Sequence, residues 1–325
     1  GGGGGGVQPT IYPVVSLSTS HASVTENSGT TVTLTVTASK ISDEDITVTL
    51  STSGTATDGT DYSAVNGSSL TITAGTTTAI KTFTITDNSI YEGNETVIVA
   101  ISTVSGGSAT ENGTQIETIT ITENESAPVI TLATSHTTVA ENSGTTITLT
   151  ATSSQVADED VVVTLASSGT ATNGTDYSSL GGQTITISAG LTTGTITGTP
   201  TDDSIYEDDE VAAIAISTVS GGGATESGTQ SVSITITENE SAPIVTLTAS
   251  ATSIAENSGS PITFTLALEI PAGVTQTTTS EDVIVQIGNS VSGYTATASG
   301  SDYQLSSTSI TIPSGSSTNT FTFSP

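Results

Sequence analysis

The chain has 325 residues, of which 32 are Asp or Glu and two are Lys or Arg, so its formal net charge is −30. Charge of this sign repels phosphate backbones and anionic lipids, which argues against binding to nucleic acid or to an acidic membrane surface. Cysteine is absent, so the chain has neither disulfides nor thiolate metal sites. We expect a bound cation to stabilise the fold in their place.

Residues 1–14 are predicted to be a glycine-rich lead, because the first six are all glycine and offer no side chains to pack. An edge strand donated to another molecule is the alternative for residues 7–15, which contain several apolar side chains. No apolar run approaches about 18 residues, so we expect no membrane span in this segment. Without an initial Met or a recognisable signal peptide, the chain is expected to be a piece of a longer protein.

Apolar residues alternate with Thr and Ser along several short segments after this lead. The clearest are 31–36 (TVTLTV), 46–50 (ITVTL) and 117–121 (ETITI). A period of two is typical of strands with one buried face, and Val, Ile and Thr suit a pleated surface. No amphipathic helical run accompanies them, so the sequence predicts an all-β fold of immunoglobulin-like sandwiches.

The sequence Glu-Asn-Ser-Gly occurs at 26–29, 141–144 and 256–259, each copy 115 residues after the previous one. Gly-Thr-Asp-Tyr recurs with the same step, at 59–62 and 174–177. A period near the size of a small domain predicts tandem domains rather than a solenoid. The predicted domains are repeat 1 (15–126), repeat 2 (127–241) and repeat 3 (242–325).

Short linkers join these repeats, because Glu-Asn-Glu-Ser-Ala-Pro at 123–128 and 238–243 leads directly into the next copy. Proline restricts the hinge, which favours an extended, semi-rigid row of domains. Repeat 3 carries an insertion at 269–276, and it lacks a counterpart of residues 201–240, which include the last two strands. Either the polypeptide continues beyond this segment, or strands of a neighbouring molecule complete the incomplete third sandwich.

Carboxylates recur at equivalent positions of repeats 1 and 2. In a seven-strand sandwich, Asp61 falls between the third and fourth strands, residues 87–95 between the fifth and sixth, and residues 123–125 after the seventh. Alternate loops of an antiparallel sandwich emerge at the same end, so these acids are expected to converge at one tip. Carboxylates gathered without Lys or Arg need protons or a cation, and hard oxygen ligands select Ca²⁺. Solvated loop ends are the alternative.

The candidate ligands differ slightly between the repeats. In repeat 1 they are Glu26, Asp61, Asp87, Glu92, Glu95, Glu123 and Glu125. In repeat 2 they are Asp176, Asp202, Asp203, Glu207, Asp208, Asp209, Glu210, Glu238 and Glu240. A further acidic trio, at 43–45 and 158–160, lies at the opposite end of each sandwich, where residues 158–160 face the tip of repeat 1. This trio either completes a bridging site at the junction or is solvated.

These landmarks together resemble the Calx-beta repeat, found in sodium/calcium exchangers and in large bacterial surface proteins. The resemblance is carried by Glu-Asn-Ser-Gly, by Gly-Thr-Ala-Thr-x-Gly-Thr-Asp-Tyr at 54–62 and 169–177, and by Asp-x-Ser-Ile-Tyr-Glu-x-x-Glu at 87–95 and 202–210. It implies calcium ligation through Glu26, Asp61, Asp87, Glu92 and Glu95, and through Glu141, Asp176, Asp202, Glu207 and Glu210. With the loop argument, the predicted metal ligands are Glu26, Asp61, Asp87, Glu92, Glu95, Glu123, Glu141, Asp176, Asp202, Asp203, Glu207, Glu210 and Glu238.

The family pattern is not matched everywhere. Family members that bind several ions often end in consecutive aspartates, where this chain has Glu-Asn-Glu, so we expect fewer or weaker ions. Repeat 2 has three more acids in its loop, Asp203, Asp208 and Asp209, and is expected to bind more strongly. The stretches 103–115 and 218–230 also look like repeats of giant adhesins from gliding bacteria.

Function is predicted from this combination. The two histidines, His21 and His136, occupy equivalent turn positions without a partnering nucleophile, so no enzymatic activity is expected. We predict a calcium-stiffened extracellular stalk of a cell-surface adhesin or filament. The alternatives are a filament subunit that polymerises by strand complementation and a calcium-sensing module. The expected partners are other domains of the same chain or neighbouring subunits, with surface glycans or proteins bound only by regions outside this segment.

Overall fold

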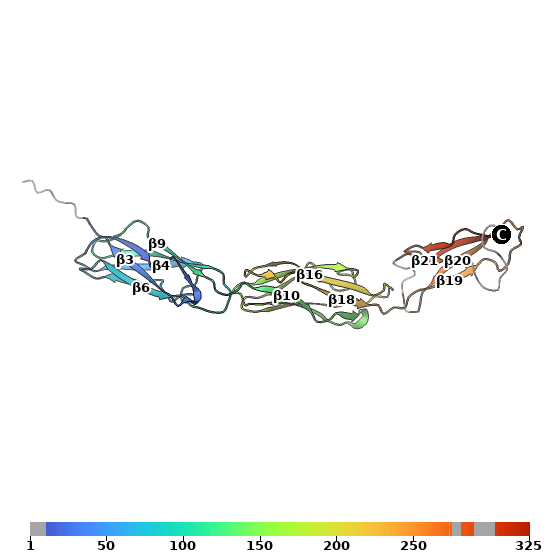
Figure 1. The fold of residues 1–325 in the computed structure, drawn as a ribbon, viewed down its shortest axis with the longest axis horizontal. Helices are drawn as coiled ribbons and strands as arrows, with labels where there is room; N and C mark the ends of the chain where they lie inside the picture. Colours follow the sequence, from blue (N-terminus) through green and yellow to red (C-terminus); the bar gives the residue numbers. More distant parts are fainter. Residues whose placement is uncertain (1–10, 273, 275–280, 289–302) are drawn as a thin grey trace, which may run out of the picture.

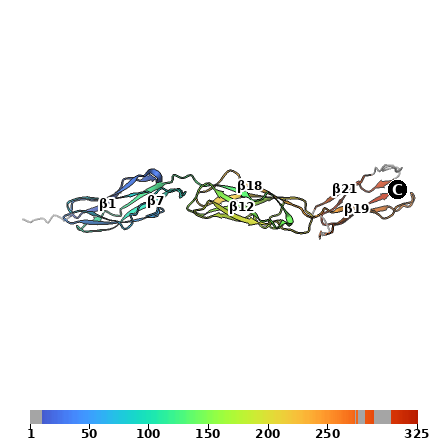
Figure 2. The ribbon, with the colours of Figure 1, turned by 90° about the horizontal axis from the view of Figure 1, so that it is seen from below.

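The structure is a computed structural model that describes residues 11–272, 274, 281–288 and 303–325. These residues are almost entirely β structure, with two short 3₁₀ turns and no α-helix. Three sandwiches follow one another in an extended row (Figures 1 and 2). Most of the predicted lead, and residues 273, 275 and 276 of the insertion at 269–276, lie outside the described residues. In the described ranges, no helix has the length and apolarity to span a membrane.

The first sandwich contains nine strands in two sheets. Its elements are β1 (Val14–Thr19), β2 (Ser23–Thr25), η1 (Glu26–Ser28), β3 (Thr31–Ala38), β4 (Ile46–Gly54), β5 (Ser69–Ile72), β6 (Thr78–Thr84), β7 (Glu95–Ser105), β8 (Thr110–Glu111) and β9 (Ile116–Thr122). The sheets have the orders β6-β3-β1-β8 and β2-β9-β7-β4-β5. The alternating segments lie within β3, β4 and β9, which confirms these strands. The first and last strands of the expected seven each divide between the two sheets.

The second sandwich repeats the first element by element. It comprises β10 (Val129–Thr134), β11 (Thr138–Ala140), η2 (Glu141–Ser143), β12 (Ile147–Ser153), β13 (Val161–Gly169), β14 (Thr184–Ile187), β15 (Thr193–Gly198), β16 (Glu210–Ser220), β17 (Thr225–Glu226) and β18 (Ser231–Thr237). Even the irregularities coincide, because the register shift between Thr49 and Leu50 recurs between Thr164 and Leu165. The 115-residue period therefore reflects a repeated three-dimensional unit.

The third sandwich has a smaller second sheet within the described residues. Its strands are β19 (Ile244–Ala249), β20 (Ile262–Glu269), β21 (Val283–Gln286), β22 (Gln304–Leu305), β23 (Ser309–Ile312) and β24 (Thr318–Ser324). They form the sheets β19-β20-β24-β22 and β21-β23. Leu247 is 54% exposed, whereas the equivalent Leu17 and Leu132 are 6% and 8% exposed. The core of this sandwich is thus less covered than the other two.

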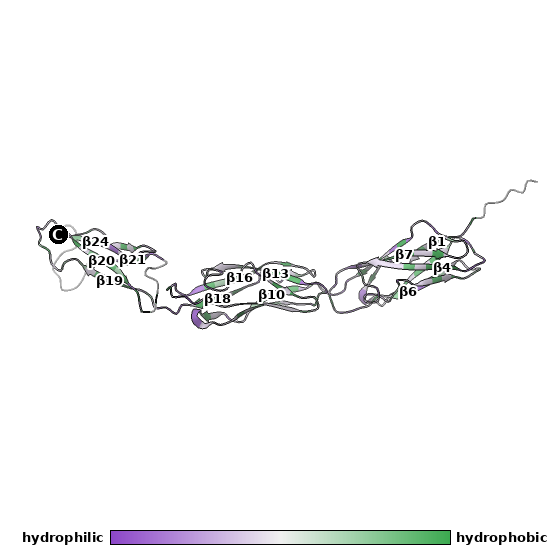
Figure 3. Ribbon diagram, turned by 180° about the vertical axis from the view of Figure 1, so that it is seen from behind, coloured by the Kyte–Doolittle hydropathy of each residue, from purple (hydrophilic) through white to green (hydrophobic). Residues whose placement is uncertain are grey.

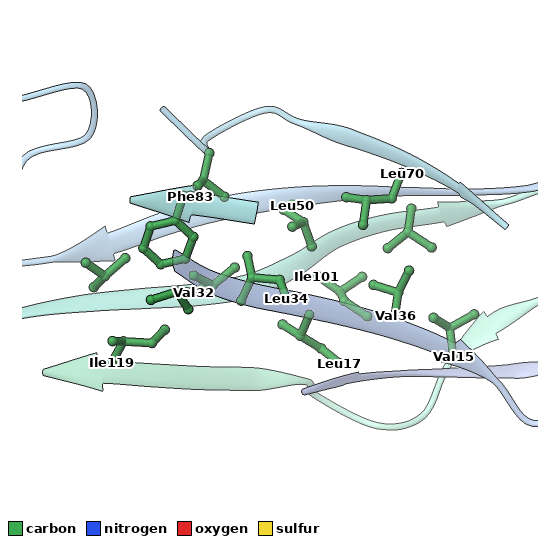
Figure 4. Close-up of a cluster of buried hydrophobic side chains, with 14 of the residues drawn as sticks. Val15, Leu17, Val32, Leu34, Val36, Leu50, Leu70, Phe83, Ile101 and Ile119 are labelled. Carbon is green, nitrogen blue, oxygen red and sulfur yellow. The ribbon is translucent and has the colours of Figure 1, made fainter. Parts of the chain in front are cut away.

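The core of each complete sandwich consists of the inward-facing half of the alternating pattern. Val32, Leu34 and Val36 of β3 are fully buried, while the threonines between them are only partly buried. Figure 4 shows these side chains directed at the same interior as Leu50 and Ile101. In Figure 3 the hydrophobic residues follow the strands, and hydrophilic residues gather at η1 and η2. Burial of one face of each sheet thus fixes the position of the loops at the sandwich ends.

We expect Leu34→Ala to lower the free energy of unfolding of the first sandwich by about 2–5 kcal/mol, because it leaves a cavity between closely packed sheets. The equivalent Leu149→Ala should destabilise the second sandwich by a similar amount. Thr82→Ala, on an exposed position of β6, should stay within about 0.5 kcal/mol of the parent. Denaturant unfolding followed by circular dichroism measures all three, and equal stability of Leu34→Ala and Thr82→Ala would contradict the core assignment.

Candidate metal centre

One end of each complete sandwich gathers four acidic segments, and we call it the tip. In the first sandwich the tip comprises η1, the β4–β5 loop, the β6–β7 loop and the residues after β9. In the β4–β5 loop, Tyr62 is 1% exposed, and its ring centroid lies 5.5 Å from that of Phe83. This anchor holds the neighbouring Asp61 in place, and Asp61 Oδ2 accepts a hydrogen bond of 2.6 Å from the Thr57 N–H. The Gly-Thr-Asp-Tyr motif thus combines a tyrosine that is anchored in the core with an acid directly before it.

The Glu-Asn-Ser-Gly motif positions a second acid. Glu26 begins the turn η1 and is 5% exposed. The turn ends at Gly29, whose φ of 64° is left-handed and disfavours a side chain. A Cβ there would meet nothing within 4 Å, so backbone conformation rather than space explains the glycine. The motif therefore turns the chain so that one carboxylate points into the tip.

Carboxylate oxygens form two groups in each complete repeat. The groups are Glu26, Glu123 and Glu125; Asp61, Glu92 and Glu95; Glu141, Glu238 and Glu240; and Asp176, Glu207 and Glu210. Within each group, one oxygen per residue lies within 4.8 Å of the others. Two oxygens bound to one Ca²⁺ at about 2.4 Å are at most about 4.8 Å apart, so this spacing is compatible with a shared calcium ion.

The hydrogen bonding of the groups is incomplete without a cation. Oε2 of Glu125 is buried and has no hydrogen-bond partner, and the same is true of Oε2 of Glu240. Glu125 also contacts the carboxylate of Glu123, and Glu95 contacts that of Asp61. Two carboxylates in contact require a proton or a cation between them, and an unpaired buried oxygen is costly. The residues present therefore fit a hard divalent cation.

The acid–base properties of the groups reflect this crowding. Burial, followed by the charge of Glu123, raises the pKa of Glu26 to about 7. Burial, followed by the charge of Asp61, raises the pKa of Glu95 to about 7. The equivalent Glu141 and Glu210 also have pKa values raised to about 7, chiefly by burial. Each complete repeat thus holds two carboxyl groups that resist ionisation at neutral pH.

Glu123 behaves differently. Burial would raise its pKa, but backbone N–H groups outweigh this and lower the pKa below its usual value. Its Oε2 accepts bonds of 2.6 and 2.9 Å from the N–H groups of Glu92 and Gly93, and its Oε1 accepts bonds of 2.8 and 2.9 Å from those of Asn124 and Glu125. Glu238 accepts the N–H of Glu207 at 2.7 Å in the same way. The ionised carboxylate of Glu123 therefore binds the backbone of the β6–β7 loop and holds this loop beside the other acids.

Ten of the thirteen predicted ligands lie in these groups. The other three are Asp87, Asp202 and Asp203. Asp87 is close enough to Glu125 for its charge to raise the pKa of that residue. Asp203 also lies beside its group, because its backbone N–H donates to Oε1 of Glu141 at 3.2 Å, while its Oδ1 caps the loop by accepting the Ile205 N–H at 2.7 Å. Sequence spacing alone did not separate these local roles from ligation.

The predicted ligand set leaves out Glu125 and Glu240, which the structure places in the groups. Both follow the last strand of their sandwich, two residues after Glu123 and Glu238. The signal for them was the repeated Glu-Asn-Glu sequence, in which the first acid takes the backbone bonds and the second points into the tip. Which of the two acids faces the group depends on that hydrogen bonding, which the sequence does not specify.

The additional acids of repeat 2 replace neutral residues of the repeat 1 loop. Asp209 Oδ1 accepts the Glu238 N–H at 2.9 Å, just as Asn94 Oδ1 accepts the Glu123 N–H at 3.0 Å. Asp208 accepts a hydrogen bond from the Tyr206 hydroxyl. A cavity of about 10 Å³, lined by acids of both groups, lies at this tip. Stronger binding by repeat 2 stays a prediction that rests on the added charge.

The acidic trio at 158–160 divides into two roles. Asp160 Oδ1 accepts the Ala189 N–H at 2.8 Å, as Asp45 Oδ1 accepts the Ala74 N–H at 2.8 Å in repeat 1. Glu159 Oε2 similarly accepts the Gly222 N–H at 3.4 Å. Only Asp158 faces the tip of repeat 1, where its charge raises the pKa of Glu92 and Glu95. The bridging hypothesis therefore applies to Asp158 alone.

Fold and site together define a tandem array of immunoglobulin-like sandwiches with acidic tips. The Calx-beta domain matches residues 9–125 and 123–240, more than half of the chain, so this chain belongs to the Calx-beta family. No curated protein sequence matches it significantly.

Several solved structures are similar. CBD12 from CALX1.2 is 16% identical over 69% of this chain and 100% of its own, with a TM-score of 0.32. The calcium binding domain CBD12 of CALX1.1 is 20% identical over 60% of this chain and 76% of its own, with a TM-score of 0.27. The Yersinia pseudotuberculosis adhesin InvE is 13% identical over 77% of this chain and 68% of its own, with a TM-score of 0.34.

The raised pKa values predict an unusual pH dependence. Glu26 and Glu95 have an ordinary pKa of 4.5 and a folded value of about 7, so the folded protein binds more protons between these limits. Their contribution to stability is complete below about pH 4.5 and is lost as the pH rises through about 7. In chelator, the melting temperature should therefore fall between about pH 5 and pH 8. Glu26→Gln and Glu95→Gln together should flatten this fall in the first sandwich, and a melting temperature that rises over the interval would contradict it.

Proposed function

We propose that this chain is a calcium-stiffened stalk segment of a large extracellular adhesin or cell-surface filament protein. The observation that carries the proposal is the recurrence of two three-carboxylate groups at the same tip of both complete repeats. In repeat 1 this tip faces the next sandwich of the row (Figure 1). An ion held there would join loops that otherwise repel one another, next to the junction between repeats.

Calcium suits these groups better than other ions. All the ligands are carboxylate oxygens on loops or strand ends, and calcium tolerates irregular coordination of six to eight oxygens. Magnesium requires a tighter octahedron, and transition metals favour nitrogen or sulfur ligands. Extracellular calcium is high enough to fill even weak sites, so a stalk outside the cell does not need the high affinity of an intracellular sensor.

A clamp between repeats would follow from the position of Asp158. This residue comes from repeat 2, and its carboxylate lies in the field of Asp61 in repeat 1. Calcium at Asp61, Glu92 and Glu95 would replace that repulsion by attraction and would favour a straight arrangement of the two sandwiches. This role is structural, and no catalytic activity is part of the proposal. The partners we propose are neighbouring domains of the same polypeptide or neighbouring subunits of a filament.

The test is titration of the complete chain with calcium, followed by calorimetry, thermal unfolding and small-angle X-ray scattering. We expect bound calcium to raise the free energy of unfolding by about 2.7 kcal/mol at one hundred times the dissociation constant. The maximum dimension should increase and the scattering profile should become that of a straighter rod. Magnesium at the same concentration should have a smaller effect.

Variants that remove carboxylates identify the site. Replacing Asp61 and Glu95 by Asn and Gln should abolish the calcium effect on repeat 1, because it removes two ligands of one group. Asp43→Asn removes a carboxylate from the opposite end of the same sandwich and should leave calcium binding unchanged. Unaltered stability and dimensions in calcium would mean that the acids are solvated loop ends, and submicromolar affinity would favour a calcium sensor over a stalk.

A further inference from the structure

The β6–β7 loop of repeat 1 pairs directly with repeat 2. The Tyr91 N–H donates to the carbonyl oxygen of Val156 at 2.8 Å, and the Asp158 N–H donates to that of Tyr91 at 3.2 Å. These bonds form a parallel β-bridge between Tyr91 and Ala157. The side-chain amide of Gln155 also donates to the carbonyl oxygen of Ser89 at 2.7 Å. Backbone pairing of this kind fixes orientation as well as distance.

The ring of Tyr91 lies against the turn between β16 and β17 of repeat 2. A Cβ at Gly223 would lie 2.6 Å from Cε1 and 2.9 Å from the hydroxyl oxygen of Tyr91. Real Cβ atoms do not approach other atoms so closely, so any side chain at 223 would displace the ring. A side chain at 223 would therefore move the far end of the Tyr91 side chain away from its present position on the turn.

The turn itself does not require glycine. Position 223 corresponds to position 108 of repeat 1, where the chain has Ser108. Ser108 has a φ of 50° and Gly223 a φ of 60°, so the same left-handed turn forms with serine. At Gly223 a tyrosine ring is packed on the turn. The glycine at 223 thus suits both the left-handed turn, which serine also forms in repeat 1, and the ring packed on it.

We infer that the N-terminal face of repeat 2 is a docking site for the tyrosine-bearing loop of the preceding repeat, and that the residue at position 223 makes this site selective. The tyrosine dock consists of Tyr91 with Val156, Ala157 and Gly223. A side chain at this position, such as that of Ser108 in repeat 1, would require the ring to shift from the position that it has on Gly223. The dock uses backbone bonds and apolar contact, so it orders the two repeats without a metal ion and is independent of the calcium proposal.

The second junction has a tyrosine at the equivalent position of the preceding repeat. There Tyr206, the equivalent of Tyr91, lines a cavity of about 370 Å³ together with Pro243, Val283 and Ile284.

Pulsed electron spin resonance on the complete chain tests the dock. The chain has no cysteine, so spin labels at Thr82→Cys and Thr197→Cys, equivalent exposed positions of repeats 1 and 2, report the junction alone. In chelator we expect a narrow distance distribution for the parent and a clearly broader one for Gly223→Ser. The reciprocal Ser108→Gly changes the equivalent turn away from the junction and should leave the distribution narrow. Because repeat 1 folds with serine here, Gly223→Ser should retain its fold, which thermal unfolding checks.

Tyr91→Ala provides a second test that does not alter a turn. It should broaden the distribution as Gly223→Ser does and should speed hydrogen exchange of the Tyr91 and Asp158 amides by about tenfold or more. Tyr206→Ala should leave both readouts unchanged. A broad distribution for the parent in chelator, or a narrow one for both Gly223→Ser and Tyr91→Ala, would overturn the dock. Neither outcome depends on whether the chain binds calcium, which the titration decides separately.

Discussion

Repulsion among buried carboxylates is the constraint on which the tips of this protein depend. The sheets bury one face of each strand, and this burial brings loops of separate origin to one end of the sandwich. Those loops carry acids, and the chain has two basic residues in total to set against them. Protonation of the acids can relieve the repulsion, and burial adds to its effect. Four carboxyl groups therefore have pKa values raised to about 7. A cation relieves it in another way, by joining the loops.

The β6–β7 loop combines two tasks in adjacent residues. Tyr91 faces repeat 2 and Glu92 faces the acidic group of repeat 1. Because they are neighbours on one backbone, an ion that holds Glu92 also limits the movement of Tyr91, and a docked Tyr91 restricts Glu92. By linkage, each event should then favour the other by the same free energy. Mechanical coupling between the tip and the junction thus follows from their order in the sequence.

Much of this arrangement was predictable from the sequence because it depends on periodicity. Alternation along 31–36 fixed a strand, and the 115-residue step fixed a repeated unit whose loops meet at one end. Individual roles were less predictable, since Asp203 and Glu125 are both acids in acidic loops. One caps a backbone N–H and the other points an unpaired oxygen into the group. That choice depends on differences of a few ångströms in loop geometry, which composition does not encode. Gly223 was missed for a related reason, because its partner ring belongs to another repeat.

Stiffness in such a row therefore has two separable sources. A metal ion acts through charge, so its contribution depends on calcium concentration, pH and ionic strength. The tyrosine dock acts through close packing and backbone bonds, so it does not itself require an ion, and calcium affects it only through the linkage between Glu92 and Tyr91. A row that used only ions would become flexible wherever calcium is scarce, whereas a row that used only docks would have no means of responding to its surroundings. With both at one junction, the dock sets the resting geometry of the repeats and the ion sets how strongly that geometry is held.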